Sequence, residues 1–379
     1  MRSEPNYNTI PVGQLGIIAL PGCEELANKI DNYLIRWRFQ RNSEHKDTLA
    51  FAGYEKSTYL INMDFPRFGT GEGKAALNQT VRGYDIYILC DVFNYGVTYK
   101  MYGMTVPMSP DEHFANLKRA ISAIEGKAKR VSVIMPMLYE GRQHKRSSRE
   151  SLDCAMMLQE LNAMGVENFI TFDAHDPRVM NAIPLCGFES ISPAYQMIKA
   201  AVNNVDNLKI NKDNIMIISP DEGGMSRCIY YSTVLGVELG MFYKRRDFSR
   251  IVDGRNPIIA HEFLGDNVEG KDVIIVDDMI SSGESMIEVA TKLKELKAAR
   301  IYIFSAFGLF CNGFDAFDKA FQEGIIDRVF TTNLIYGTPE LLSKDWYVRV
   351  DMSKYLSYII DTLNHDTSIS DLLDPAEKI

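Results

Sequence analysis

One stretch in the C-terminal half of the sequence combines carboxylates, hydroxyls and a glycine in an order suited to sugar-phosphate chemistry. Residues 273–285 read VIIVDDMISSGES, so Asp277 and Asp278 directly follow a run of apolar β-formers. A helix is expected to begin at about Glu284, and the backbone N–H groups at a helix N-terminus bind phosphate. Carboxylates at a strand end can accept hydrogen bonds from sugar hydroxyls or hold a divalent ion through water. The hydroxyls that would join this site belong to Ser281, Ser282 and Ser285.

Three further segments bring together charged residues of complementary kinds. Residues 219–227 read SPDEGGMSR, with Asp221 at a strand end beside a pair of glycines that lets a ligand approach the backbone. Residues 171–176 read TFDAHD, with His175 between two carboxylates, and residues 243–246 read YKRR. Taken alone, a histidine is usually structural and a basic cluster usually lies on a solvated surface. Beside paired carboxylates, the same groups could hold a metal ion and an anionic substrate.

The composition narrows the class of protein. The chain has 379 residues, of which 46% are hydrophobic, which suggests about two domains, each with a buried core. A net charge of -9 argues against broad contact with nucleic-acid backbone, although local basic clusters can still bind small anions. No run approaches the roughly 18 apolar residues of a membrane helix, and the six cysteines form no zinc pattern. We therefore expect a soluble, cytoplasmic protein with no nucleic-acid or membrane partner.

Strand and helix patterns alternate along the chain. Amphipathic spacing predicts helices over 114–124 and 284–296. The near-continuous apolar runs between such segments suit strands that are covered on both faces. This alternation predicts an α/β fold with mainly parallel sheets, in which ligands bind at the carboxyl ends of strands. The clearest predicted strands are 84–90, 130–135, 169–172, 215–219, 272–276 and 300–306.

The order of patterns also suggests two related halves. A strand, polar loop, helix and strand starting at Arg130 resemble a similar series starting at Asp272. The polar segment 195–214 could connect the halves, and the aromatic, Met-rich segment 93–110 is predicted to be a surface loop or excursion. Residues 352–363 have the spacing of an amphipathic helix that packs back on the body of the protein.

Six segments together resemble the motifs of one enzyme family. The run DDMISSGES resembles the ribose-phosphate-binding motif of type I phosphoribosyltransferases and of phosphoribosyl pyrophosphate synthetases. SPDEGG, DAH and YKRR resemble the SPDxGG motif, the DLH motif and the catalytic flexible loop of the synthetases. GRQHKR at 141–146 resembles their RQDK stretch, and 68–83 resembles their FSNQE nucleotide loop, which runs on to VRG. The likeness covers about 61–333 in the family's order, so the chain resembles the ribose-phosphate pyrophosphokinases.

That resemblance implies a reaction and a role for each motif. The family transfers a pyrophosphoryl group from MgATP to the anomeric hydroxyl of ribose 5-phosphate and releases AMP. By resemblance, Lys244 and Arg246 would close over the site as catalytic residues, while His175 and Asp221 would contact Mg²⁺ or its water shell. ATP would be held by Phe68, Glu72, Arg142 and Gln143, the first two reaching the adenine from a neighbouring subunit. Ribose 5-phosphate would be held by Asp277, Asp278, Ser281, Ser282, Gly283 and Ser285.

The resemblance also implies an architecture. It predicts two tandem phosphoribosyltransferase-like domains, the first over 1–192 and rejoined by the C-terminal helix at 350–379. The second would cover 193–349 and carry the ribose-phosphate loop. A homo-oligomer, either a dimer or a hexamer, is implied by the family.

Several positions depart from the family's motifs. The nucleotide loop has Gly-Thr-Gly at 69–71 where the family has Ser-Asn-Gln, which removes an amide contact to adenine. DLHA has become DAHD and RQDK has become RQHK. The ribose loop has Ser281 and Glu284 where Asp and Gly are common, and a carboxylate beside a phosphate repels it unless it points away.

Two alternatives follow from these departures and likenesses. A phosphoribosyltransferase would share the DDMISSG run, but it would leave KRR, SPDEGG and DAHD unexplained. A non-catalytic regulatory homologue of the synthetase would explain the altered nucleotide loop, but such proteins typically lose the basic loop or the ribose loop, and both are present here.

Overall fold

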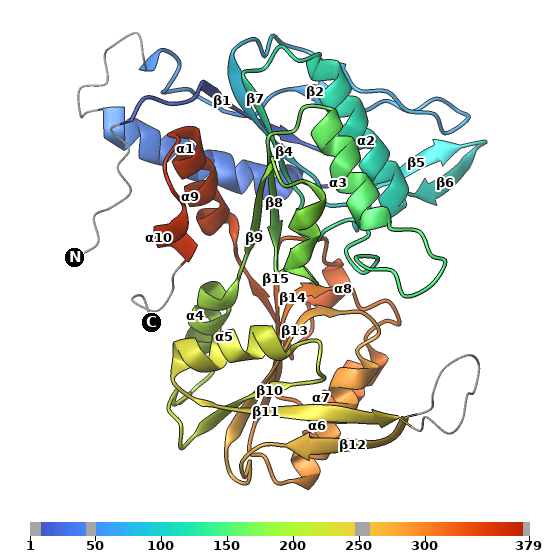
Figure 1. Cartoon of the computed structure of the whole chain (residues 1–379), viewed down its shortest axis with the longest axis vertical. Helices are drawn as coiled ribbons and strands as arrows, with labels where there is room; N and C mark the ends of the chain where they lie inside the picture. Colours follow the sequence, from blue (N-terminus) through green and yellow to red (C-terminus); the bar gives the residue numbers. More distant parts are fainter. Residues whose placement is uncertain (1–8, 43–50, 247–257, 374–379) are drawn as a thin grey trace. The chain divides into compact units, whose positions relative to one another are not determined.

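The computed structural model describes residues 9–42, 51–246 and 258–373 and divides them into two compact units (Figure 1). The first unit holds the chain up to Ser192, the short segment Asn333–Tyr336 and the chain from Asp351 onward. The second holds Pro193–Thr332 and Gly337–Val350. Each unit has its own sheet and its own hydrophobic core.

Unit 1 is built on a five-stranded, fully parallel sheet in the order β1-β4-β7-β8-β9. The central strands are nearly all buried because helices cover both faces. The strands are β1 Gln14–Ala19, β4 Tyr84–Leu89, β7 Arg130–Ile134, β8 Asn168–Phe172 and β9 Gly187–Ile191. The long helices are α1 Glu24–Asn42, α2 Pro110–Ile124, α3 Asp153–Ala163 and α9 Ser353–Asn364.

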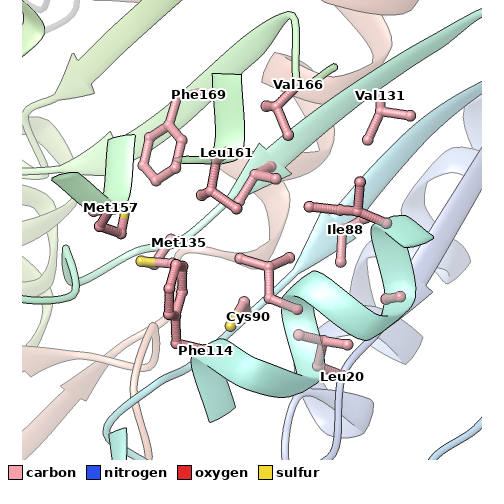
Figure 2. Close-up of a cluster of buried hydrophobic side chains, with 14 of the residues drawn as sticks. Leu20, Ile88, Cys90, Phe114, Val131, Met135, Met157, Leu161, Val166 and Phe169 are labelled. Atoms are coloured by element: carbon pink, nitrogen blue, oxygen red, sulfur yellow. The ribbon is translucent and has the colours of Figure 1, made fainter. Parts of the chain in front are cut away.

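The four helices cover the two opposite faces of the sheet, toward which successive strand side chains alternately point. Figure 2 shows Ile88 of β4 and Val131 of β7 packed with Phe114 of α2 and Leu161 of α3. Successive strand residues point to opposite faces, so Tyr87, next to Ile88, faces the other side of the sheet. On that side lie α1 and α9, which pack against each other. The predicted C-terminal helix is therefore present, and it packs within unit 1.

Unit 2 contains a seven-stranded sheet in the order β12-β11-β10-β13-β14-β15-β16 among the described residues. All neighbours are parallel except β11 and β12, which are antiparallel. The strands are β10 Ile215–Ser219, β11 Glu238–Arg246, β12 Ile258–Leu264, β13 Asp272–Ile280, β14 Ile301–Gly308, β15 Arg328–Thr332 and β16 Tyr347–Val350. The helices are α4 Ala194–Asn204, α5 Met225–Leu235, α6 Glu284–Glu295, α7 Asp315–Gln322 and α8 Pro339–Leu342.

The remaining elements are short. They are the strand pairs β2 Met63–Asp64 with β3 Ala76–Leu77 and β5 Thr98–Met101 with β6 Met104–Pro107, the 3-10 helix η2 Pro177–Ala182, and α10 Ser370–Leu373. In the part of the chain that the structure describes, none of the helices has the length and apolarity needed to span a bilayer.

The α/β class with mainly parallel sheets is confirmed, and all six predicted strands are present. Two segments differ from expectation. The predicted loop 93–110 contains the antiparallel hairpin β5–β6, most of whose residues are exposed. The predicted connector 195–214 begins with α4, which buries Met197, Ile198 and Ala201 and packs against β15 and β16.

Candidate active site

The paired carboxylates lie inside β13, which continues to Ile280, four residues beyond the predicted strand. Asp278 is buried, and its backbone N–H donates to Asp277 Oδ1 at 2.9 Å. Burial and then the charge of Asp278 raise the pKa of Asp277 well above its ordinary value. The guanidinium of Arg227, 3.6 Å from Asp277 Oδ1, acts in the opposite direction. Two carboxylates held this close favour a ligand that brings hydroxyl donors or positive charge.

The loop after β13 requires a glycine at position 283. Gly283 has φ +82°, and a Cβ there would stand 2.2 Å from Cε2 of the buried Phe317. Gly283 is the residue before α6, so the first N–H groups of that helix open beside Ser282 and Ser285. The backbone carbonyl of Ser281 accepts from Cys311 N at 2.8 Å, which fixes the loop to the segment after β14. This arrangement suits a phosphate.

Glu284 is directed toward the same neighbouring segment. Its Oε1 accepts a hydrogen bond from Asn312 Nδ2 at 3.3 Å. The contact gives the carboxylate a partner within unit 2.

Asp221 and Arg227 belong to the segment after β10, the strand that pairs directly with β13. Asp221 Oδ1 accepts from Gly223 N at 2.9 Å and from Gly224 N at 3.3 Å, so the carboxylate organises the turn that precedes α5. No role is predicted for Arg227 from the sequence, because its position beside Asp277 depends on the pairing of β10 with β13, which local sequence does not show.

The basic cluster lies on a strand, whereas its resemblance to a flexible loop implied an irregular segment. The backbones of Lys244 and Arg246 belong to β11 and pair with His261 and Ile258 of β12, with a bulge between Arg245 and Arg246. Antiparallel pairing with β12 supplies the hydrogen bonds that extend the strand this far. The side chains of Lys244 and Arg246 and the residues 247–257 that follow lie outside the described part of the chain.

Three of the predicted residues in unit 1, Arg142, Gln143 and His175, follow the carboxyl ends of β7 and β8, which are also neighbours. His175 follows β8 and is exposed. Asp173 has φ +41°, a conformation that non-glycine residues rarely adopt and that concentrates at functional sites. Asp176 accepts hydrogen bonds from Arg178, which lower its pKa to about 2.

The loop after β7 carries Arg142 and Gln143. Gln143 Nε2 donates to the carbonyl of Ser151 at 2.8 Å, and its backbone N–H donates to Glu140 O at 2.8 Å. The side chain of Gln143 therefore fastens its own loop. Arg142 is exposed and is the better placed of the two to reach a ligand.

The segment 68–72 forms a tight turn in unit 1. Phe68 N donates to Glu72 O at 2.8 Å, and Tyr102 N of the β5–β6 hairpin donates to Gly69 O at 2.8 Å. The Phe68 ring is 55% exposed, and the Glu72 carboxylate accepts from Thr70 Oγ1 at 2.9 Å. The turn thus presents an aromatic ring and a carboxylate at the surface, a combination that can stack on and hydrogen-bond a base.

Within the described residues, no group of three or more His, Cys, Asp or Glu side chains is arranged to hold a metal ion. Mg²⁺ does not need such a cage, because it commonly keeps several waters and binds through one or two carboxylates and substrate phosphates. The carboxylate of Asp221 fits that donor set, whereas His175 suits contact through a bound water better than direct ligation.

Three family models match successive and partly overlapping parts of the chain. Residues 15–165 match the N-terminal domain of ribose phosphate pyrophosphokinase, 188–308 a phosphoribosyl transferase domain, and 250–374 a phosphoribosyl synthetase-associated domain. The chain is 26% identical over 308 residues to a ribose-phosphate pyrophosphokinase of Vibrio parahaemolyticus. These residues cover 80% of this chain and 88% of that protein. A ribose-phosphate pyrophosphokinase of Shewanella oneidensis is 27% identical with the same coverage.

The fold is similar to a solved structure as well. The crystal structure of phosphoribosylpyrophosphate synthetase from Mycobacterium smegmatis matches with a TM-score of 0.71 at 18% identity. The match covers 93% of this chain and 99% of that one.

Proposed function

The chain belongs to the ribose-phosphate pyrophosphokinase family, and from that premise we propose that it converts ribose 5-phosphate and MgATP to phosphoribosyl pyrophosphate and AMP. In this reaction the anomeric hydroxyl oxygen attacks the β-phosphorus of ATP. The bond from that phosphorus to the α,β-bridging oxygen breaks, AMP leaves with the electron pair, and the hydroxyl proton passes to solvent. The observation that carries the proposal is the ribose loop, where four residues separate the Asp277–Asp278 pair from Gly283, the residue before the start of α6.

Ribose 5-phosphate would bind along this loop. The 5-phosphate would accept hydrogen bonds from the first N–H groups of α6 and from the hydroxyls of Ser281, Ser282 and Ser285. Gly283 lets the loop pack closely against Phe317, and this packing supports a fixed position for the start of α6. Asp277 and Asp278 would accept hydrogen bonds from the ribose hydroxyls, and Arg227 would balance their charge.

Transfer of the pyrophosphoryl group rests on positioning and on neutralising charge, since the displacement is in line at phosphorus. Lys244 and Arg246 would supply positive charge around the transferred group. Arg142 would bind ATP phosphates through the fork of its guanidinium, with Gln143 holding the loop in place. Phe68 and Glu72 would meet the adenine.

A magnesium ion fits this assignment. We propose that Asp221 and His175 each contact Mg²⁺ ions or their water shells; when bound, such ions neutralise the negative charge on the ATP oxygens.

We further propose that residues 1–192 with 350–379, and residues 193–349, are the two phosphoribosyltransferase-like domains. The division of the described chain at Ser192 and Asp351 supports these limits. A homo-oligomer, dimer or hexamer, and a cytoplasmic location are part of the same proposal. The six unpaired cysteines agree with a reducing compartment.

One observation favours a second candidate, a non-catalytic regulatory homologue of the synthetase. The nucleotide turn has Gly69-Thr70-Gly71 and offers no side-chain amide to adenine. Such a homologue would bind ribose 5-phosphate without forming AMP.

The deciding experiment measures AMP formation from ATP by the purified full-length protein, with and without ribose 5-phosphate, in Mg²⁺ and phosphate buffer. AMP that depends on the sugar would establish pyrophosphoryl transfer. Binding of ribose 5-phosphate without AMP would favour the regulatory homologue.

A matched pair of lysine variants tests the catalytic assignment in the same assay. We expect Lys244→Ala to remove most of the turnover, by about 100-fold or more, because charge on the transferred group would go unbalanced. The control is Lys319→Ala, whose side chain is 74% exposed on α7 and which should keep wild-type turnover. Equal loss of melting temperature and activity in Lys244→Ala would contradict a catalytic role.

A further inference from the structure

Two loops of unit 1 bring a second histidine against the proposed metal-contacting His175. His144, from the loop after β7, lies with its ring centroid 5.3 Å from that of His175, at an interplanar angle of 61°. His144 Nε2 also stands 3.5 Å from Asp176 Oδ2. The side chains of His144 and Asp176 are each only 11% exposed, whereas His175 is exposed. The exposed His175 ring therefore packs against His144, which is largely buried together with Asp176.

His144 has one polar atom that the protein does not satisfy. Its Nδ1 is buried and makes no hydrogen bond to any described residue. A buried polar nitrogen without a partner is costly, and such atoms in folded proteins usually mark contact with water or a ligand. This nitrogen is suited to a hydrogen bond with a water or a hydroxyl in the site.

Asp176 is held rigidly enough to orient His144. Its Oδ1 accepts from the backbone N–H of Arg178 at 3.0 Å at the start of η2, and the Arg178 guanidinium donates to both of its carboxylate oxygens. The carboxylate therefore cannot rotate freely, and it fixes which nitrogen of His144 it faces.

The two members of this pair are two of the three positions at which the motifs of these loops depart from the family, the third being Ala174. Position 144 is histidine where RQDK has aspartate, and position 176 is aspartate where DLHA has alanine. The structure brings both departures into contact. One carboxylate is thus lost from the first loop and one is gained in the second.

We propose that His144 and Asp176 are a coupled pair of positioning residues, in which Asp176 orients His144 and His144 holds the ring of His175 toward the ATP side of the site. The proposal rests on the proposed function. In this proposal His144 and Asp176 compensate each other. Changing either residue alone therefore lowers activity, whereas changing both together does not.

A double-mutant cycle tests the coupling. His144→Asp places a second carboxylate beside Asp176, and Asp176→Ala removes the partner of His144 Nε2. We expect each single variant to lower kcat/KM for ATP by about tenfold or more, with little change in the KM for ribose 5-phosphate. The double variant H144D/D176A should return to within about threefold of wild type. Losses that multiply in the double variant would overturn the proposal.

Two further measurements separate positioning from a merely structural role and from failure of the proposed function. His144→Gln, which keeps a polar nitrogen near Asp176 without adding a charge, should retain most of the activity that His144→Asp loses. Nitrogen-15 NMR of the histidine rings detects the His144–Asp176 contact without any turnover. The chemical shifts of the His175 ring nitrogens should change in both single variants and return to wild-type values in H144D/D176A. Unchanged His175 signals would refute the pair, whereas restored signals without sugar-dependent AMP formation in the wild type would refute only the proposed function.

Discussion

Gly283 shows how one residue can decide whether the ribose loop forms. Its φ of +82° alone disfavours a side chain, and a Cβ would also meet Phe317 at 2.2 Å. We expect Gly283→Ala to raise the KM for ribose 5-phosphate by at least tenfold, because the loop and the start of α6 must shift. Steady-state kinetics and thermal unfolding measure this. The matched control is Gly270→Ala, which has φ +76° but open space around a Cβ, so it carries the conformational cost without the collision.

The buried carboxyl group of Asp91 should make the stability of the protein depend on pH. It accepts from Phe93 N at 3.0 Å and from Tyr336 N at 2.7 Å, and burial raises its pKa to about 7 from 3.8. Because the folded pKa is the higher one, this group's contribution to stability is complete below about pH 4. It is lost as the pH rises through 7. Asp91→Asn cannot ionise, so urea unfolding should show wild type losing about 2 to 3 kcal/mol relative to the variant between pH 5 and pH 8. Parallel profiles would contradict the assignment.

At the scale of elements, the docking of α9 in unit 1 depends on a buried ion pair. Arg38 of α1 donates to Asp361 from Nε at 2.9 Å and from a terminal nitrogen at 2.8 Å, and the terminal nitrogen also bonds Asn364 at 2.6 Å. We expect Asp361→Ala to lower the free energy of unfolding by about 3 to 5 kcal/mol, since it leaves the Arg38 charge buried without its partner. Chemical denaturation measures the loss. Lys354→Ala, on the exposed face of α9, should change stability by less than about 0.5 kcal/mol.

The sequence predicts elements well where burial leaves a pattern and poorly where it does not. Strands such as β4, reading YDIYIL, are covered on both faces and so appear as apolar runs. The strands of the mostly exposed β5–β6 hairpin are only four residues long, so the alternation in TYKM and MTVP is too short to predict strands, and the turn has positive φ at Tyr102 and Gly103.

The same distinction applies to the candidate site. Residues that follow a buried strand, such as His175 and Asp277, could be placed at a sheet edge from local sequence alone. Arg227 and His144 could not, because their significance comes from the neighbouring strand, which is a matter of strand order. The strand character of Lys244 also depends on a distant partner, β12. The roles of the site residues themselves stay predictions.

At the scale of the whole molecule, two separate cores imply that a ligand of one unit can stabilise that unit locally. The ribose loop lies in unit 2, with β13 and α6 packed into its core. Ribose 5-phosphate at 100 times its dissociation constant should stabilise that unit by about 2.7 kcal/mol. Hydrogen exchange should therefore slow in β13 and α6, while β4 of unit 1 is unaffected. Ser282→Glu should abolish the effect by repelling the phosphate, and Asn203→Glu, which adds the same charge on exposed α4, should preserve it. Slower exchange in Ser282→Glu as well would place the phosphate away from this loop, and equal slowing in both units would mean that they unfold together.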